Sequence, residues 1–281
     1  MAAVASKIPV TSLRSLYGMF DLFCSLECHL AMAEEARRDH NPAVLAELFQ
    51  RSVERFSEYS NVEEPFYPDR PPRKELPDPQ GIDRIGGTLS LTAFLKAAGT
   101  ARVVDNPDLD FVFVDRELVP ARTTGNAFFE NDDPSIRVRR LDWLLANAHD
   151  QLPGIAEVKV GNDKNPFYAL VQLLMYAAEL VTPAQLSRLR RHYPDRFKLP
   201  DSAGGGTDAQ GPVMDLYIVI SNYNPRSDLR QEILETTSQL AQRLVVEKGV
   251  SRYIRKIACL DVTLEKDKQL RFTKVFEYFD R

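Results

Sequence analysis

Apolar residues follow two spacings along this chain, one typical of helices and one typical of strands. Apolar positions three or four residues apart predict helices over residues 13–38, 41–60 and 227–249, and a further helix that begins at residue 165. Short apolar runs predict strands over residues 110–122, 136–148, 152–160, 213–221, 254–265 and 269–279. The first strand carries a predicted turn near Asp115 and Arg116, and residues 89–98 fit either a helix or a strand.

Prolines and capping residues divide these segments. Asn41-Pro42 and Asn165-Pro166 each place an N-cap asparagine before a proline at the first helical position, where the missing N–H has no helical partner. The proline-dense residues 62–87 cannot form a long helix or a central strand, so we expect an extended connection over the surface. The short polar break at His149 and Asp150 predicts a hairpin between the strands on either side.

The order of predicted elements is helix, several strands, helix, strand, helix and closing strands, which is typical of a mixed α/β fold. With 281 residues, the chain is a little beyond the size at which one core usually stops growing. We therefore expect an N-terminal helical extension (1–62), a proline-rich connection (63–88) and one core domain (89–281).

Composition and charge narrow the classes of function. The chain has 44% hydrophobic and 27% charged residues, as globular proteins do. A net charge of −4 argues against a protein that coats polyanions, although a local basic groove can still attract nucleic acid. No apolar stretch is long enough to span a bilayer, and no secretory signal opens the sequence, so we expect a cytoplasmic location and no membrane partner.

The three cysteines are an odd number and do not make a disulfide framework. Cys24 and Cys28 lie four residues apart on a predicted helix, with His29 adjacent. They are either half of a metal site or two small apolar side chains on a buried face. The second interpretation is favoured, because a structural zinc site needs four ligands and only Cys259 remains, far along the chain.

The strand over residues 152–160 carries the most informative side chains. Glu157 and Lys159 are two positions apart, so they point to the same face of an apolar strand. Burying two charges is unfavourable unless they pair or hold a metal, and a site that needs a metal ligand beside a cation is one reason to accept that cost. If the hairpin is centred near residue 149 or 150, Asp142 lies opposite Glu157 or one position away, whereas a one-residue slip would turn it to the other face.

The following helix presents a polar stripe at spacings of three or four residues: Tyr168, Gln172, Tyr176 and Glu179. Asp142 on one strand and Glu157-x-Lys159 on the next resemble the paired strands of the PD-(D/E)xK nuclease superfamily. The Gln172-x-x-x-Tyr176 spacing on the helix is most similar to its RecB-like branch. The resemblance covers residues 137–181.

This resemblance implies a restriction-endonuclease-like core, with a central mixed sheet flanked by helices, and the activity of a metal-dependent nuclease that hydrolyses phosphodiester bonds. It implies that Asp142 and Glu157 bind Mg²⁺ or Mn²⁺ as hard oxygen ligands, with the carbonyl of Val158 as a further ligand. Lys159 would hold or help to deprotonate the attacking water and offset charge in the transition state. Gln172 would orient the water, Lys159 or a phosphate.

The same resemblance suggests lesser roles for other residues. Tyr176 would support the helix or touch the strand backbone. Some branches add an acid from the first helix, for which Glu47, Glu54 and Glu58 are candidates. Other members hold an iron–sulfur cluster with four cysteines, and the three poorly placed cysteines of this chain predict none.

Several alternatives stay open at this level. We expect DNA as the substrate, because most members with this motif set act on it. A second hypothesis is a catalytically inactive protein of the same fold that binds nucleic acid or serves as a structural module. The closing strands and the N-terminal helices could also form a subunit interface in a homodimer. Two basic clusters are typical of solvated faces or, beside a nuclease site, of phosphate contacts: Arg137, Arg139 and Arg140, and Arg188, Arg190 and Arg191.

Overall fold

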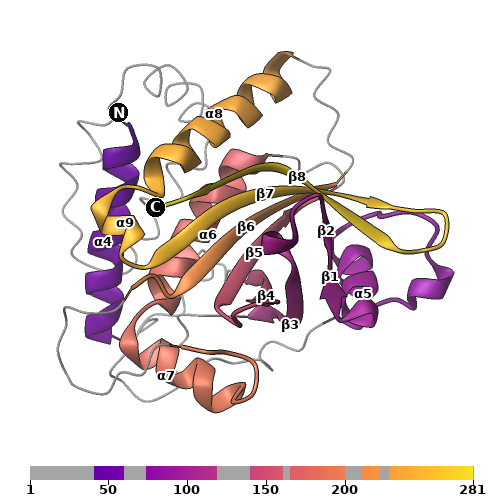
Figure 1. Cartoon of the computed structure of the whole chain (residues 1–281), viewed down its shortest axis with the longest axis horizontal. Coiled ribbons are helices and arrows are strands. Elements are labelled where there is room, and N and C mark those ends of the chain that lie inside the picture. The colour runs from indigo at the N-terminus through magenta and orange to yellow at the C-terminus, as the bar shows by residue number, and fades with distance from the viewer. Residues whose placement is uncertain are drawn as a thin grey trace, which may run out of the picture.

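The computed structural model describes residues 41–59, 74–118, 140–160, 165–199, 211–221 and 228–280, which form an eight-stranded sheet flanked by helices (Figure 1). The helices are α4 (Asn41–Tyr59), α5 (Thr88–Ala98), α6 (Pro166–Leu180), α7 (Pro183–His192), α8 (Asp228–Leu244) and α9 (Lys248–Ser251). The strands are β1 (Thr100–Ala101), β2 (Val103–Val104), β3 (Phe111–Leu118), β4 (Leu141–Asn147), β5 (Pro153–Lys159), β6 (Met214–Ser221), β7 (Ile254–Leu264) and β8 (Leu270–Phe279). The predicted mixed α/β class is confirmed.

The strands lie in the order β1-β3-β4-β5-β6-β7-β8-β2. β3, β4 and β5 are antiparallel neighbours, β5, β6 and β7 run parallel, and β8 returns antiparallel to β7. The two-residue strands β1 and β2 follow each other in the chain but lie at opposite ends of this order, beside β3 and β8. The sheet therefore curls until its two edges nearly meet, and Figure 1 shows β1 and β2 close together at this seam.

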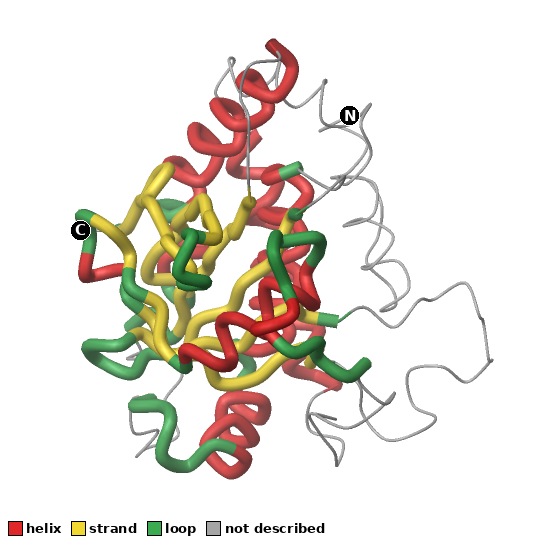
Figure 2. Tube along the Cα trace, turned by 90° about the vertical axis from the view of Figure 1, so that its right-hand side faces the viewer, coloured by secondary structure: helices red, strands yellow, loops and turns green. Residues whose placement is uncertain are grey.

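Each face of the sheet has its own hydrophobic cluster, because alternate residues of a strand point to opposite faces. Ile155 and Leu216 pack under α4, α6 and α8, whereas Trp143 and Tyr217 pack on the other face under α5. Every residue of β6 is buried, as expected of a strand covered on both sides. Figure 2 shows the strands at the centre and the helices around them.

Helix α6 is the central helix of the first cluster, and Tyr168 is its only residue that is not buried. Within the described residues, no single helix has the length and hydropathy of a membrane span. Only α6 and α7, taken together, reach that length and hydropathy, and the two helices are bent by 87° relative to each other.

Most of the local predictions are confirmed where the structure describes the chain. α6 begins at Pro166, where the Asn165 side chain accepts a hydrogen bond from the N–H of Tyr168. The predicted cap of α4 at Asn41 stays a prediction, since residues 1–40 lie outside the described residues. β7 and β8 form the closing hairpin. The ambiguous residues 89–98 belong to helix α5, which is capped by Gly99 with φ of 73°, a conformation that favours glycine.

Two local predictions are wrong. The turn near Asp115 and Arg116 is absent, since β3 continues through both residues. The strand is instead interrupted by a β-bulge between Phe113 and Asp115, where its register with β4 shifts. The helix over 227–249 is divided, because α8 ends at Leu244 and α9 begins only at Lys248. The predicted helix over 13–38 lies outside the described residues.

Helix α4 packs against α6 and α8 within the first cluster, so residues 41–59 share the core of the sheet. The described part of the proline-rich connection contains a short 3-10 turn, Pro79–Gly81, capped by Asp78. The proposed division into residues 1–62, 63–88 and 89–281 stays a prediction, since its first boundary lies outside the described residues.

Candidate active site

The hairpin of β4 and β5 has the register that brings the two predicted acids together. Trp143 pairs with Ala156, and Ala146 pairs with Pro153. Continuing this register by one residue places Asp142 opposite Glu157, on the same face of the sheet. The hairpin is thus centred between residues 149 and 150, as the sequence predicted.

The two strands separate at this point. Their pairing stops at Trp143 and Ala156, although β4 begins at Leu141 and β5 continues to Lys159. Beyond the last pair, Oδ2 of Asp142 accepts a hydrogen bond of 2.8 Å from the backbone N–H of Val158. A carboxylate therefore occupies the place of a backbone acceptor, and it lies where the strands open.

Glu157 and Lys159 form a buried ion pair beneath α6. Their residues are only 5% and 3% exposed. The Lys159 ammonium donates to Oε1 of Glu157 at 3.1 Å and to Oε1 of Gln172 at 2.6 Å, and lies 4.4 Å from the centre of the Tyr168 ring. The ammonium is therefore surrounded by a carboxylate, an amide oxygen and an aromatic face, all of which favour positive charge.

Helix α6 fixes this arrangement through one stripe of side chains. Tyr168 and Gln172, four residues apart, both reach Lys159. One turn further, the hydroxyl of Tyr176 donates to the carbonyl of Arg140 at 3.1 Å, just before β4. The helix thus holds both strands of the hairpin, and Tyr176 makes the strand-backbone contact that the sequence suggested.

Sequence reasoning did not identify Tyr168 or Glu117 as neighbours of this site. Glu117 lies on β3 between two residues paired with β4, so it is next to Asp142 across the strands. Its carboxylate accepts from Arg116 at 2.7 Å and lies 3.6 Å from the guanidinium of Arg140. Only the register of β3 and β4, which depends on the bulge in β3, could have revealed this neighbour.

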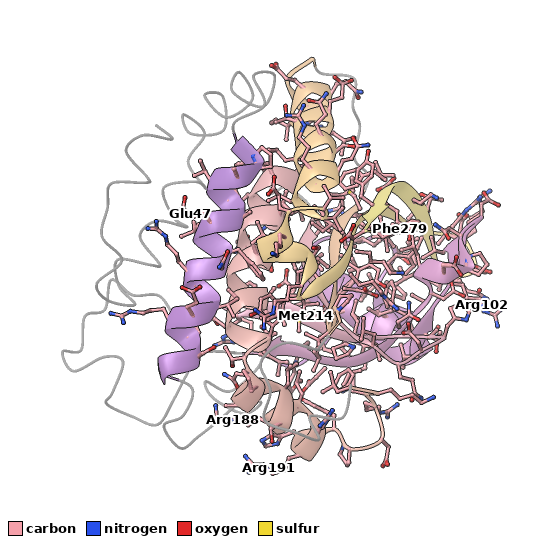
Figure 3. All side chains as sticks on the ribbon, turned by 60° about the vertical axis from the view of Figure 1, so that its left-hand side comes forward. Glu47, Arg102, Arg188, Arg191, Met214 and Phe279 are labelled. Carbon is pink, nitrogen blue, oxygen red and sulfur yellow. The ribbon has the colours of Figure 1, made fainter. Side chains whose placement is uncertain are left out.

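The candidates for an additional acid on the first helix lie elsewhere. Glu47 forms an ion pair with Arg51 on the exposed side of α4, and Figure 3 shows it pointing away from the sheet. Glu54 is exposed and accepts a hydrogen bond from Gln50. The side chain of Glu58 lies outside the described residues. Among the described residues, no three acidic, histidine or cysteine side chains converge on one point.

Two carboxylates are nevertheless a donor set that suits Mg²⁺. This ion is commonly held by one or two carboxylates and completes its coordination with waters and substrate phosphates. Asp142 and Glu157 supply hard oxygen ligands from neighbouring strands. Val158 follows Glu157 on β5 and donates its N–H to Asp142, and its backbone carbonyl is a further oxygen. The residues present therefore fit the ion that the resemblance implies.

A second group of buried charges lies at the other end of the sheet. Asp215, fully buried at the start of β6, accepts hydrogen bonds from Arg255 at 2.9 and 2.5 Å, and Lys256 lies 3.9 Å away. Burial raises the pKa of Asp215, and Arg255 opposes this effect. Asp215 pairs with Gly154, at the opposite end of β5 from Lys159, so this group ties the strands together away from the candidate site.

The basic cluster on α7 is less exposed than the sequence suggested. Arg188 is buried and donates to Gln185 at 3.4 Å, so it does not belong to a solvated face. Arg190 donates to the carbonyl of Leu199, while Arg191 is exposed. Figure 3 shows Arg188 and Arg191 on this helix, at one end of the molecule. Arg137 and Arg139 lie outside the described residues.

Comparisons of this chain with models of protein families, with curated proteins and with solved structures find no match.

Proposed function

We propose that this protein is a metal-dependent nuclease, a hydrolase of phosphodiester bonds in nucleic acid, with DNA as the expected substrate. The observation that carries the proposal is the Lys159 ammonium, buried between Glu157 and Gln172 on the strand next to Asp142. We also propose that the hairpin, α6 and the parallel strands form a restriction-endonuclease-like core. The register of the hairpin and the hydrogen bond between Lys159 and Gln172 support this proposal.

The cost of this arrangement supports a chemical role. Charges removed from water lose several kcal/mol of hydration each, and a buried ion pair seldom recovers more than it loses. Glu157 and Lys159 are buried in a strand whose other residues are all buried, where apolar side chains would fit. A fixed ammonium beside two carboxylates is, by contrast, well suited to a reaction that gathers negative charge on a phosphate.

Each residue has a distinct role in the proposal. Asp142 and Glu157 would hold the metal ion, which would polarise the phosphate and lower the pKa of a bound water. Lys159 stabilises the charge that develops on the phosphate oxygens, and Gln172 keeps its ammonium in place through the 2.6 Å hydrogen bond. Tyr176 holds the backbone at Arg140, so that Asp142 stays at the opening of the two strands.

The direct test is cleavage of labelled DNA and RNA, single- and double-stranded, in the presence of Mg²⁺ or Mn²⁺. We expect the wild-type protein to cut at least one of these substrates. Asp142→Asn keeps an oxygen that can accept from the Val158 N–H but removes the charge, so we expect it to lose at least a hundredfold in rate. A wild-type protein that binds nucleic acid without cutting any of them would support the non-catalytic alternative.

Lys256→Met is a matched control for Lys159→Met. Both lysines are buried on strands of the same sheet, at 6% and 3% exposure, and each pairs with carboxylates. Only Lys159 lies at the candidate site. We expect Lys159→Met to abolish cleavage and Lys256→Met, despite any loss of stability, to retain it. Equal cutting by the wild type and by Lys159→Met would refute the assignment.

A further inference from the structure

Tyr168 differs from the other residues of α6 in what surrounds it. It is the only residue of that helix that is not buried, and it belongs to neither hydrophobic cluster, whereas Phe167 and Tyr176 lie within the first cluster. Among the described residues, none forms a hydrogen bond with its hydroxyl group. Packing of the core therefore does not account for an aromatic ring at this position.

The ring of Tyr168 instead lies against the ammonium of Lys159, whose nitrogen is 4.4 Å from the ring centre. The face of an aromatic ring is negative and attracts a cation within about 6 Å of its centre. Burial alone does not require such a ring. The ammonium of the buried Lys256 donates to the carbonyl of Asp108 at 2.9 Å and lies 3.9 Å from the carboxylate of Asp215, with no ring against it among the described residues.

The start of α6 holds the ring in this place. The side chain of Asn165 accepts a hydrogen bond of 3.1 Å from the N–H of Tyr168, which fixes the first turn of the helix. Gln172 follows four residues later on the same side of the helix, and its amide oxygen accepts from the same ammonium at 2.6 Å. The helix therefore contacts the ammonium of Lys159 through two side chains, while Glu157 contacts it from the strand.

We propose that Tyr168 is a positioning residue of the candidate site, whose ring holds the Lys159 ammonium against Glu157 and Gln172 and shields it from water. This inference rests on the proposed function, in which that ammonium meets the charge on a phosphate. A lysine has a flexible stem, so its ammonium stabilises a transition state best when neighbouring groups keep it in one place. The Lys159 side chain is only 4% exposed, and Tyr168 is half-buried, between this ammonium and solvent.

Chemical labelling of lysines tests this shielding without nucleic acid. Brief treatment of the folded protein with a low dose of acetic anhydride, followed by mass spectrometry, gives an acetylation rate for each lysine. Tyr168→Leu keeps an apolar side chain but removes the ring, so we expect Lys159 to react faster than in the wild type by about fivefold or more. Tyr168→Phe keeps the ring and lacks only the hydroxyl group, so we expect the wild-type rate.

Two controls separate loss of the ring from a general loosening of the fold. Lys256 is also buried, and its acetylation rate should stay unchanged in every variant. Tyr253→Leu removes another half-buried tyrosine, whose ring lies 5.5 Å from the guanidinium of Arg252 just before β7, and should leave the rate of Lys159 unchanged. An equally slow Lys159 in Tyr168→Leu, or a Lys256 that accelerates together with Lys159 in that variant, would overturn the proposal.

Cleavage kinetics test the role of the ring in the reaction. We expect Tyr168→Leu to lower kcat by about 2- to 30-fold, the range of a cation–π contact, with KM near the wild-type value, and Tyr168→Phe to keep most of the activity. A raised KM with unchanged kcat would mean that the ring binds a base of the substrate instead. That result, or a wild-type kcat in Tyr168→Leu, would overturn the proposal. A wild-type protein that cuts no substrate would refute the proposed function, whereas the labelling rates test Tyr168 independently, so the two failures are distinguishable.

Discussion

The buried ion pair of Glu157 and Lys159 allows stability and activity to be separated. We predict that Lys159→Met lowers the free energy of unfolding by roughly 3–5 kcal/mol, because it leaves the carboxylate of Glu157, in a residue only 5% exposed, without its ammonium partner. The methionine fills most of the space of the lysine stem, so a cavity contributes little to this loss.

The double variant Glu157→Met/Lys159→Met should regain most of that stability. Replacing both members of a buried pair by apolar residues is often neutral or stabilising by about 1–4 kcal/mol, since neither charge then has to leave water. Gln172 loses the donor that lies 2.6 Å from its oxygen, which costs about 1–3 kcal/mol. We therefore expect the double variant to be about as stable as the wild type and to cut no nucleic acid.

Urea unfolding measures these differences, and the chain carries its own probe. Trp143 is the only tryptophan, and it is fully buried on β4, where its ring N–H donates to Thr92. Its fluorescence should report loss of the sheet in every variant, with an unchanged denaturant slope if unfolding stays two-state. A double variant as unstable as the sum of the two single variants would mean that the charges hold the fold together. The argument that they are retained for chemistry would then be refuted.

Two further predictions use the same unfolding measurement. Partial burial raises the pKa of Asp150, but its hydrogen bond and ion pair with Arg255 outweigh this and hold the pKa below the ordinary value of 3.8. The carboxylate therefore stabilises the fold above about pH 4, and this contribution is lost as the pH falls through the folded-state pKa. We expect Asp150→Asn to cost stability at neutral pH and the difference from wild type to shrink below about pH 4; a difference that stays constant would contradict this. At Gly154, an added Cβ would lie 2.9 Å from a ring carbon of the fully buried Tyr217, so Gly154→Ala should cost about 1–3 kcal/mol. Unchanged stability would show that the ring can move.

The amino-acid sequence predicted which side chains lie together at the candidate site, because their placement follows local rules. Glu157 and Lys159 share a face because a strand alternates, and α6 begins where Asn165 can cap it. The short turn between β4 and β5 then fixes the register that places Asp142 opposite Glu157. Each of these features depends on residues close together in the chain.

The sequence failed where distant contacts decide the outcome. Asp115 and Arg116 suggested a turn, because two charged residues interrupt an apolar run. In the structure, Asp115 accepts from the hydroxyl of Tyr193, and Arg116 donates to the carbonyl of Lys74. These partners come from segments far away in sequence, and they allow β3 to continue.

Local periodicity, capping and turn length thus determined the type of most elements and the residues that carry the candidate chemistry. Tertiary structure alone decided that the sheet nearly closes on itself, that Tyr168 covers the Lys159 ammonium and that Arg188 is buried. The physical reason is the distance along the chain over which each kind of interaction acts. Backbone spacing and caps are set within a few residues, whereas burial and strand order depend on contacts between elements that a linear pattern does not place beside each other.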